Sequence, residues 1–560
     1  MTRADQTEFA SLYPHGAGPS AGTAEDTRIR VFHADRIISL DGTEPTAFAT
    51  LGEIIIDSGA SEDLRRRYPR AEHTRLEGAL VTPGFNDAHC HPSVTSENRL
   101  RIDVSASVVG SLADITAKLG SAAKRTPAGE WVIAAGYDAA RTEPGRRLDR
   151  WMLDRVSSDH PIAVIVFNWH IAVVNSAALK AIGFDAETPD PVGGELGRDA
   201  SGELDGWLYE QAFLRPYWAG SDRPQWVADP DLDALVTALA EENQYLHSLG
   251  ITSYCDAIVT PNVWKVYARA LAEGKLTPRV GMLLWYTYFD TVRELGISAG
   301  FGDTHLRYVG LKTMYDGALS GGTCLCSRPY RSATGKDNGL QLLDAADFDD
   351  LVRQVHAAGD RICVHANGDL AIARVLDAVE AAQAAAPGVP RLNHRIEHCS
   401  MADLGLMTRI KKAGATPVPF GGLVRQYGDQ LKHFYGDEQA AVTLPHRAFL
   451  EAGIEIGGSS DYPVTPASPL HAMQSLATRT TLNGTVVGDK QRISAVDALS
   501  IYSVGSAHAT GEAGLKGRLT PGQLADFVVL DKDITTVDPE ALAETKVLST
   551  WVGGDRVWGN

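Results

Sequence analysis

Two histidines, His89 and His91, lie one residue apart at the end of an apolar stretch, in the sequence PGFNDAHCHP. Side chains alternate between the two faces of a strand, so both imidazoles should point to one side and Cys90 to the other. Two neighbouring imidazoles suit a metal ion. Such a pair also occurs at solvated strand ends and in packed cores, so the motif alone leaves both interpretations open.

Further residues of metal-binding or acid–base type occur at or near the ends of other apolar segments. They are Lys312, His365, His398 and Asp461. A single histidine at the end of a strand is more often structural than a ligand. Together with His89 and His91, these four make a set of six suitable residues at the same end of successive strands, an arrangement that chance rarely produces. In a parallel barrel, the active site lies at that end of the strands.

The central part of the chain alternates apolar strand candidates with Ala- and Leu-rich helical segments. The strand candidates are GALVTPGFNDAH, GITSYCDAI, RVGMLLWYT, RYVGLKTMYDG, RICVHANGD, NHRIEHCSM, GATPVPF and GIEIGGSSD. Eight strands in a repeated strand–helix pattern predict an α/β fold with a parallel (β/α)8 TIM barrel. The first two candidates are unusually far apart, which predicts an inserted subdomain, about residues 94–249, over the barrel mouth.

Short strand candidates separated by turn residues lie at both ends of the chain. Neither end carries enough strands for a covered sheet of its own. We therefore predict one composite β-sandwich from residues 28–84 and 505–560, with the barrel between them at 85–504. Residues 1–27 are polar and rich in Gly, Ala and Pro, and are predicted to form a flexible tail.

Composition narrows the classes of partner. The 560 residues carry a formal net charge of -18, which argues against nucleic acid or an anionic membrane. No apolar run approaches the length of a membrane span, and the N-terminus lacks the apolar segment of a signal peptide. The six cysteines are thinly spread, and the Cys324-x-Cys326 pair has no second pair to complete a structural zinc site. These features predict a cytoplasmic protein with a small-molecule substrate and leave its oligomeric state open, a homodimer included.

Taken together, the motifs resemble the metal-dependent amidohydrolase superfamily. LVTPGFNDAHCH resembles its opening signature. Segments along the rest of the chain resemble the YtcJ-like branch, amidohydrolase family 3: GLKTMYDGALSGGT, VHANGDLAIARVLDAVE, RIEHCSMAD, GGSSDYPVTPASP and LKGRLTPGQLADFVVLD. The resemblance covers nearly the whole chain after the predicted tail. It implies a distorted (β/α)8 barrel with a composite β-sandwich, and a hydrolase of non-peptide amide-type bonds.

The resemblance also implies a centre of one or two divalent ions, for which imidazole and carboxylate ligands favour Zn²⁺. His89 and His91 would bind the more buried ion together with Asp461. His365 and His398 would hold the second ion.

Lys312 would be carbamylated by carbon dioxide, giving an anion that bridges two ions, because a protonated amine cannot bind a cation. A buried lysine near cations has a lowered pKa and can react in this way. The alternative is an unmodified lysine that pairs with Asp316 or with substrate beside a single ion. A bridging role for Cys255 is a further alternative.

The residues assigned to catalysis are Asp461, His170 and His398. In such a centre, metal-bound water loses a proton at a pH of about 7 and attacks as hydroxide. Asp461 would carry the proton from the water to the leaving nitrogen. The second ion, with His170 from the insertion, would polarise the carbonyl. The chain departs from the family pattern at Asn367, at Leu370 and in FNWH, where Asp-Gly-His is more usual.

The predicted reaction is hydrolysis of a small N-substituted amide or formamide. The same site could instead hydrolyse an ester, a lactone or a cyclic ureide, or decarboxylate its substrate. A non-catalytic scaffold is the remaining alternative. The complete set of six ligand-competent residues favours an enzyme over a scaffold.

Overall fold

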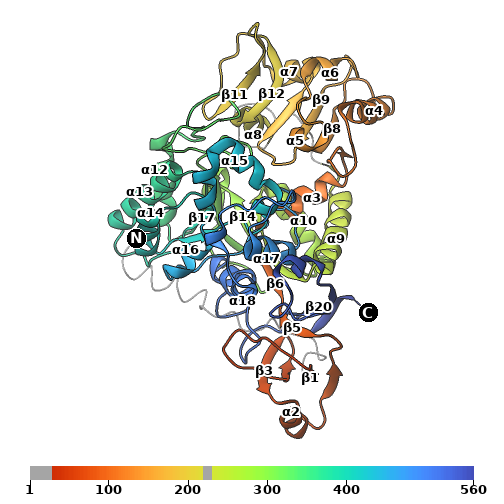
Figure 1. Cartoon of the computed structure of the whole chain (residues 1–560), viewed down its shortest axis with the longest axis vertical. Coiled ribbons are helices and arrows are strands. Elements are labelled where there is room, and N and C mark those ends of the chain that lie inside the picture. The colour runs from red at the N-terminus through yellow and green to blue at the C-terminus, as the bar shows by residue number, and fades with distance from the viewer. Residues whose placement is uncertain (1–27, 218–229, 560) are drawn as a thin grey trace.

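The computed structural model describes residues 28–217 and 230–559, arranged in three parts along the long axis of the molecule (Figure 1). A parallel barrel occupies the middle. A mixed sheet formed between residues 102 and 210 covers one end of the barrel, and two small sheets lie at the other end. The predicted flexible tail, residues 1–27, lies outside the described residues.

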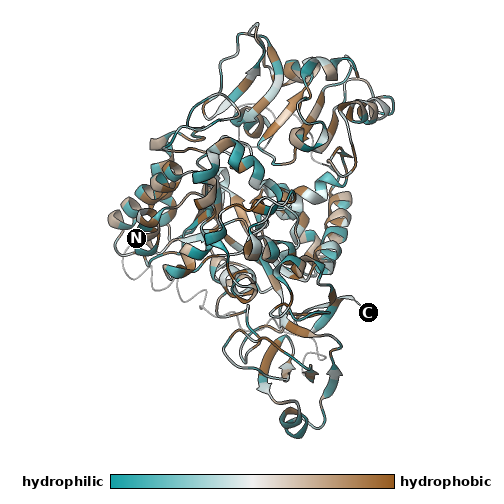
Figure 2. Ribbon diagram, viewed as in Figure 1, coloured by the Kyte–Doolittle hydropathy of each residue, from teal (hydrophilic) through white to brown (hydrophobic). Residues whose placement is uncertain are grey.

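The barrel sheet has seven parallel strands in the order β18-β17-β16-β15-β14-β13-β6. They are β6 (Phe85–Cys90), β13 (Ile251–Val259), β14 (Arg279–Trp285), β15 (Leu306–Met314), β16 (Ile362–Ala366), β17 (Arg395–His398) and β18 (Thr416–Val418). Every residue of β13 and β14 is buried, as expected of strands that are covered on both faces. Figure 2 shows apolar residues along the strands, with polar residues on the surrounding helices.

The predicted eighth strand, residues 453–461, runs between β18 and β6 without forming a regular strand. On one side the Gly457 N–H donates to the carbonyl of Pro417 (3.1 Å), and on the other the Asp461 N–H donates to that of His89 (2.9 Å). The segment thereby bridges the two edges of the sheet. At its end Asp461, with a φ of 52°, leaves the extended conformation.

Helices surround the strands. They are α3 (Pro92–Asn98), α9 (Leu232–Ser248), α10 (Pro261–Ala272), α11 (Phe289–Glu294), α12 (Ala345–Ala357), α13 (Asp369–Ala385), α14 (Leu404–Ala413), α15 (Leu423–Val442), α16 (His446–Glu451), α17 (Pro469–Thr478), α18 (Ala495–Ser500) and α19 (Ser506–Ala509). Although α9 lies within the segment predicted as an insertion, it packs against α3, α10 and β13. It therefore belongs to the wall of the barrel.

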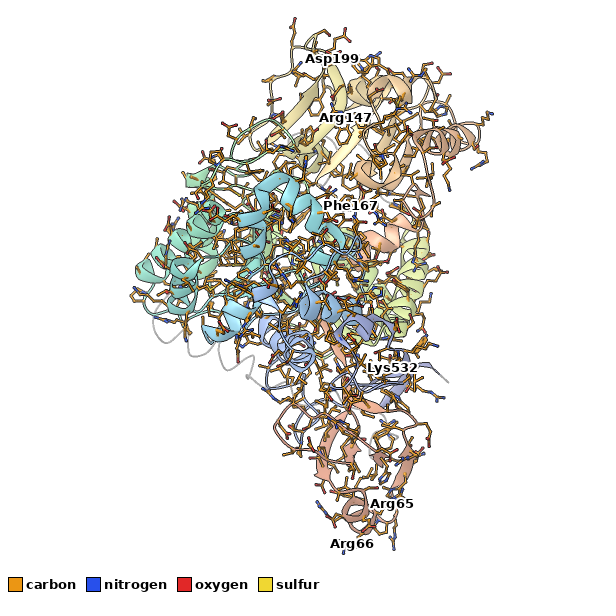
Figure 3. The ribbon with its side chains drawn as sticks, in the orientation of Figure 1. Arg65, Arg66, Arg147, Phe167, Asp199 and Lys532 are labelled. Atoms are coloured by element: carbon orange, nitrogen blue, oxygen red, sulfur yellow. The ribbon has the colours of Figure 1, made fainter. Side chains whose placement is uncertain are left out.

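The sheet over the barrel, here called the lid, has the strand order β11-β12-β10-β9-β8-β7. Its strands are β7 (Ile102–Asp103), β8 (Val132–Tyr137), β9 (Ile162–Val166), β10 (Ile171–Val174), β11 (Gly194–Arg198) and β12 (Leu204–Glu210), with helices α4 (Leu112–Ala123), α5 (Ala139–Thr142), α6 (Arg150–Asp154), α7 (Ser176–Ile182) and α8 (Gln211–Tyr217). Phe167, at the junction of the lid and the barrel (Figure 3), stacks on Tyr427 of α15 with ring centroids 4.8 Å apart. This contact joins the lid loop to the barrel.

The two small sheets have the orders β3-β2-β1-β4 and β21-β20-β19-β5. Their elements are β1 (Ile29–His33), β2 (Ala47–Leu51), β3 (Ile54–Gly59), α2 (Ser61–Arg67), β4 (Glu72–Arg75), β5 (Leu80–Pro83), β19 (Phe527–Leu530), β20 (Val547–Val552) and β21 (Asp555–Gly559). Strands from both ends of the chain pair directly, β5 with β19. The aromatic rings of Phe32, Phe48 and Phe527 pack in one apolar cluster that both sheets share.

None of the helices in the described part of the chain combines the length and the apolar character that crossing a bilayer would require.

Candidate functional site

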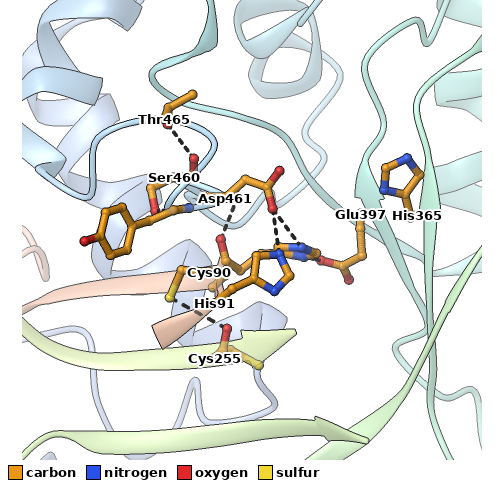
Figure 4. Close-up of polar contacts among 12 residues, drawn as sticks. Cys90, His91, Cys255, His365, Glu397, Ser460, Asp461 and Thr465 are labelled. Atoms are coloured by element: carbon orange, nitrogen blue, oxygen red, sulfur yellow. Dashed lines mark hydrogen bonds and ion pairs between the residues drawn. The ribbon is translucent and has the colours of Figure 1, made fainter. Parts of the chain in front are cut away.

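The imidazoles of His89 and His91 meet the carboxylate of Asp461 at the C-terminal end of the barrel strands (Figure 4). Asp461 Oδ1 lies 3.3 Å from His89 Nε2 and 3.0 Å from His91 Nε2. Among the residues that the structure describes, these three form the one cluster of potential His, Cys, Asp or Glu ligands. Cys90 points the other way, with its thiol directed at the Cys255 carbonyl, which confirms the predicted alternation.

The protonation states in this cluster suit a cation. Burial alone would raise the pKa of Asp461, but the nearby His398 ring and the contacts with His89 and His91 hold it well below its usual range. Burial lowers the pKa of His91. An ionised carboxylate and neutral imidazoles are the forms that bind divalent ions.

His365 and His398 extend the cluster across the pocket. The His398 ring centroid lies 4.8 Å from that of His89 and 4.5 Å from that of His365. Burial lowers the pKa of both His365 and His398 well below the ordinary value, and each is lowered further by a neighbouring histidine. The Nδ1 atoms of His91 and His398 are buried without a hydrogen-bond partner. Neutral, partly unsatisfied imidazoles beside a carboxylate fit a divalent metal centre.

Lys312 lines the same pocket, from β15. Burial lowers its pKa to about 8, although the carboxylates of Glu397 and Asp461 act in the opposite direction. The ion pairs of the described residues do not include one between Lys312 and Asp316. The Asp316 carboxylate instead accepts backbone N–H groups from Leu325 (2.9 Å) and Gly368 (2.8 Å).

Sequence reasoning missed the residues that hold His89. Glu397, one residue before His398, accepts a short hydrogen bond from His89 Nδ1 and two from Arg395, each 2.7 Å long. Burial would raise the pKa of Glu397, but Arg395 and His89 hold it far below the usual range. Fixing Nδ1 in this way leaves Nε2 of His89 directed at Asp461, as a histidine ligand requires. The signal in the sequence was the charged pair in RIEH, inside an apolar strand.

The backbone is strained at the positions that direct these side chains. Positive φ angles occur at Trp169 (59°), Glu210 (49°), His398 (69°) and Asp461 (52°). Simple alternation along β17 would send His398 to the face opposite Glu397. The positive φ ends that alternation, so both side chains reach the site. Each such conformation costs about 1–3 kcal/mol and persists only where packing enforces it.

The lid contributes a histidine–carboxylate dyad. His170 Nδ1 lies 2.6 Å from Glu210 Oε2, and the hydroxyl of Thr323 donates to Glu210 Oε1 (2.6 Å). Burial would lower the pKa of His170, but the Glu210 carboxylate raises it above the ordinary value. Because Glu210 holds Nδ1, Nε2 is the nitrogen available to a molecule in the pocket. The sequence indicated His170 but not Glu210.

The pocket is formed by barrel and lid residues together and contains about 420 Å³ of unfilled space, its open mouth included. It is lined by His89, His91, Val94, Asn168, Trp169, His170, Ile258, Lys312, Met314, His365, His398, Asp461, Pro463 and Val464. All six predicted ligand residues and His170 are among them.

Two of the departures from the family pattern, Asn367 and Leu370, do not line the pocket. Asn367 donates from its backbone to Asp316 (2.9 Å), accepts from Ser400 Oγ (2.7 Å), and places its amide nitrogen 2.9 Å from His365 Nε2. It therefore positions His365. Leu370 is exposed and is not among the lining residues.

Cys255 was weighed as a ligand that bridges two ions. Its thiol lies 3.7 Å from Arg395 Nη1 inside the barrel, and it does not line the pocket. The geometry gives no support to a bridging role.

Comparison with known proteins agrees with this geometry. The model of the family described as "Amidohydrolase family" matches residues 75–558. The chain is 30% identical over 515 residues to the N-substituted formamide deformylase of Arthrobacter pascens, covering 90% of this chain and 93% of that protein. It is 28% identical to YtcJ of Bacillus subtilis (strain 168) over 547 residues, covering 94% of this chain and 99% of YtcJ.

Solved structures share the fold. An uncharacterized metal-dependent hydrolase from Pyrococcus horikoshii superposes with a TM-score of 0.72 at 21% identity, covering 91% of this chain and 99% of that one. Its counterpart from Pyrococcus furiosus has a TM-score of 0.69 at 23% identity, covering 91% of this chain and all of that one.

The hydrogen bond from His89 to Glu397 makes a prediction. Glu397→Gln should weaken divalent-metal binding by roughly 10–100-fold, the usual effect of removing the carboxylate behind a ligating histidine. Titration with zinc against a competing chelator measures this affinity. Glu455→Gln, which alters an exposed carboxylate paired with His508, serves as the control and should bind zinc normally. Wild-type affinity in a folded Glu397→Gln protein would contradict the assignment.

Proposed function

The chain belongs to the amidohydrolase family, in its YtcJ-like branch, and is a hydrolase of carbon–nitrogen bonds; from this premise we propose that it cleaves a small N-substituted amide or formamide with one or two divalent ions. The observation that carries the proposal is the convergence of all six predicted ligand residues on one buried pocket. The deformylase activity named for the Arthrobacter pascens relative supports the formamide class.

The donor set suits zinc, because four imidazoles and a carboxylate are ligands that this ion prefers. His89, His91 and Asp461 would hold one ion, and His365 and His398 a second. A divalent ion bound there would polarise the substrate carbonyl and lower the pKa of water to about 7.

The protein's own groups would move the proton. Asp461, ionised and in contact with His89 and His91, would accept the proton of the attacking water and return it to the leaving nitrogen. His170, held through Nδ1 by Glu210, would donate a hydrogen bond from Nε2 to the carbonyl oxygen as negative charge develops there.

The apolar side chains of the pocket wall support a particular kind of substrate. The lining includes Val94, Trp169, Ile258, Met314, Pro463 and Val464. These side chains offer van der Waals contact to an apolar substituent but few polar partners. They support a substrate with an apolar group on nitrogen, whose reacting carbonyl faces the histidines.

A panel of metal-loaded assays tests the reaction class. We expect the zinc-loaded protein to release formate and amine from formamides with apolar N-substituents, and to act more slowly on matched formate esters, lactones and cyclic ureides. Asp461→Asn should lower turnover by roughly 10²–10⁴-fold or more, since proton transfer alone contributes that much. If the protein hydrolyses esters or ureides but not amides, it cleaves a bond of another class than the one proposed. If it hydrolyses no compound of the panel, the result favours a non-catalytic scaffold.

The role of the His170–Glu210 dyad in catalysis can be tested separately from metal binding. His170→Gln should lower kcat, while metal content and thermal unfolding stay at wild-type values, because no ligand is removed. Glu210→Gln should lower kcat in the same direction, since His170 would lose the carboxylate that orients it. Steady-state kinetics and elemental analysis together measure this. If both variants keep wild-type kcat, the lid histidine has no part in the chemistry.

Lys312 is proposed to be carbamylated. Its lowered pKa provides neutral amine near physiological pH, and neutral amine is the form that reacts with carbon dioxide. The resulting anion would add negative charge to a pocket of four histidines and one aspartate, where two divalent ions need it. Asp316 accepts backbone N–H groups, and the ion pairs of the described residues include none between it and Lys312.

Carbon-13 NMR of metal-loaded protein equilibrated with labelled bicarbonate tests the modification. The wild type should show a carbamate signal and bind two ions per chain. Lys312→Ala should lose the signal, the second ion and most activity, with partial recovery of the ion and activity when short carboxylic acids are added. Lys312→Arg, which keeps the charge but cannot be carbamylated, should show no recovery. A wild-type protein without the signal and with one ion per chain would be a mononuclear enzyme.

A further inference from the structure

Three sulfur atoms meet outside the catalytic pocket. Cys324 Sγ lies 3.5 Å from Cys326 Sγ, and Cys326 Sγ lies 3.4 Å from Met401 Sδ. All three side chains are buried. The thiols belong to the loop between β15 and α12, whereas Met401 follows β17. The fold therefore brings together sulfur atoms from two segments that are far apart in the sequence.

The loop that carries the thiols is held in place by its backbone. The Leu325 N–H donates to Asp316 (2.9 Å), and the Cys326 N–H donates to the carbonyl of Asn338 (3.0 Å). The hydroxyl of Tyr330 donates to the Cys324 carbonyl (2.7 Å). With the backbone fixed on both sides of Leu325, the two thiols stay directed toward each other, so their convergence requires no ordering of a loose chain.

The cluster is open to the outside without passing through the catalytic pocket. Cys326 and Met401 line a wide cavity of about 1770 Å³, its open side included, together with Tyr330, Met407 and Tyr435. None of these residues lines the catalytic pocket. A small ion can approach Cys326 and Met401 from this cavity, and Cys324 lies behind them.

The donor set selects the kind of ion. Two thiols and a thioether are soft ligands, which prefer Cu(I) over Zn²⁺, Mg²⁺ or Ca²⁺. In the described part of the chain no His, Asp or Glu joins the two thiols to complete a ligand set for a harder ion. We propose that Cys324, Cys326 and Met401 form a binding site for one soft monovalent ion of the Cu(I) type.

The geometry requires only a small change. Metal–sulfur bonds of about 2.3 Å place three trigonal ligands about 4.0 Å apart, so Cys326 Sγ would move about 0.5 Å farther from each of its two sulfur neighbours. Binding one Cu⁺ to two thiols and a thioether releases two protons and leaves a complex with a single negative charge. The hydroxyl of Tyr435 lies 3.2 Å from Cys324 Sγ and donates to the Leu319 carbonyl (2.8 Å), so it would reach that charge by turning its proton away from the carbonyl.

A redox switch fits the same residues less well. Burial raises the pKa of Cys324 well above its ordinary value, and the neighbouring Cys326 raises it further. The thiolate is the form that reacts with oxidants, so a protonated thiol oxidises slowly. A soft ion, by contrast, displaces the proton as it binds.

The test uses zinc-loaded full-length protein, to which Cu(I) is supplied anaerobically from a competing chelator. The wild type should take up one copper per chain, seen by native mass spectrometry, and X-ray absorption at the copper edge should show sulfur ligands. Cys324→Ser/Cys326→Ser should lose this copper. Met401→Leu should weaken the binding by roughly tenfold or more, as loss of a metal-site partner commonly does.

Met407→Leu is the matched control, because Met407 lines the same cavity but makes no sulfur contact with either thiol. It should bind copper as the wild type does. If the double variant does not fold, Cys326→Ser and Met401→Leu give the same comparison. Sulfur-ligated copper that persists in these variants, or a wild type that takes up none, would overturn the proposal. Neither result depends on the hydrolase reaction.

Discussion

The buried chain of contacts from Arg395 through Glu397 to His89 is the interaction on which the site depends. A carboxylate without exposure to water is stable only when its charge is matched, and here the Arg395 guanidinium matches it while the His89 ring donates a hydrogen bond to it. Because Glu397 holds Nδ1 of His89, the opposite nitrogen must face Asp461. Arg395 and Glu397, inside the barrel, thus orient the His89 ring without any bound ion.

The same constraint shapes the backbone around the pocket. Glu397 and His398 are adjacent, yet both must reach the site from one strand end, which alternation forbids. The positive φ at His398 resolves the conflict, and a positive φ at Asp461 turns the eighth barrel segment toward His89. The strain is held by dense packing on all sides, since every residue of β17 is buried.

Glu210 forms a hydrogen-bonded junction between the lid and the barrel. Glu210 of the lid binds His170 through one oxygen and accepts from Thr323 of the barrel loop through the other. The next residue along that loop is Cys324, and the loop is anchored further by Asp316. The lid histidine and the sulfur cluster are therefore fixed by a single loop, although they face different cavities.

The sequence by itself determined the family and the parallel barrel, because strand periodicity and short motifs are local properties. It predicted as metal ligands six residues that line one pocket in the structure: His89, His91, Lys312, His365, His398 and Asp461. It also predicted that Cys90 faces away from His89 and His91. Only the tertiary structure decided which partners stand behind those residues. Glu397 lies 308 positions from His89, and no local pattern records that contact. The irregular backbone of the eighth segment, the support of His170 by Glu210 and the contact of Cys326 with Met401 were equally hidden. Side-chain direction past a strand end depends on φ and on packing between distant segments.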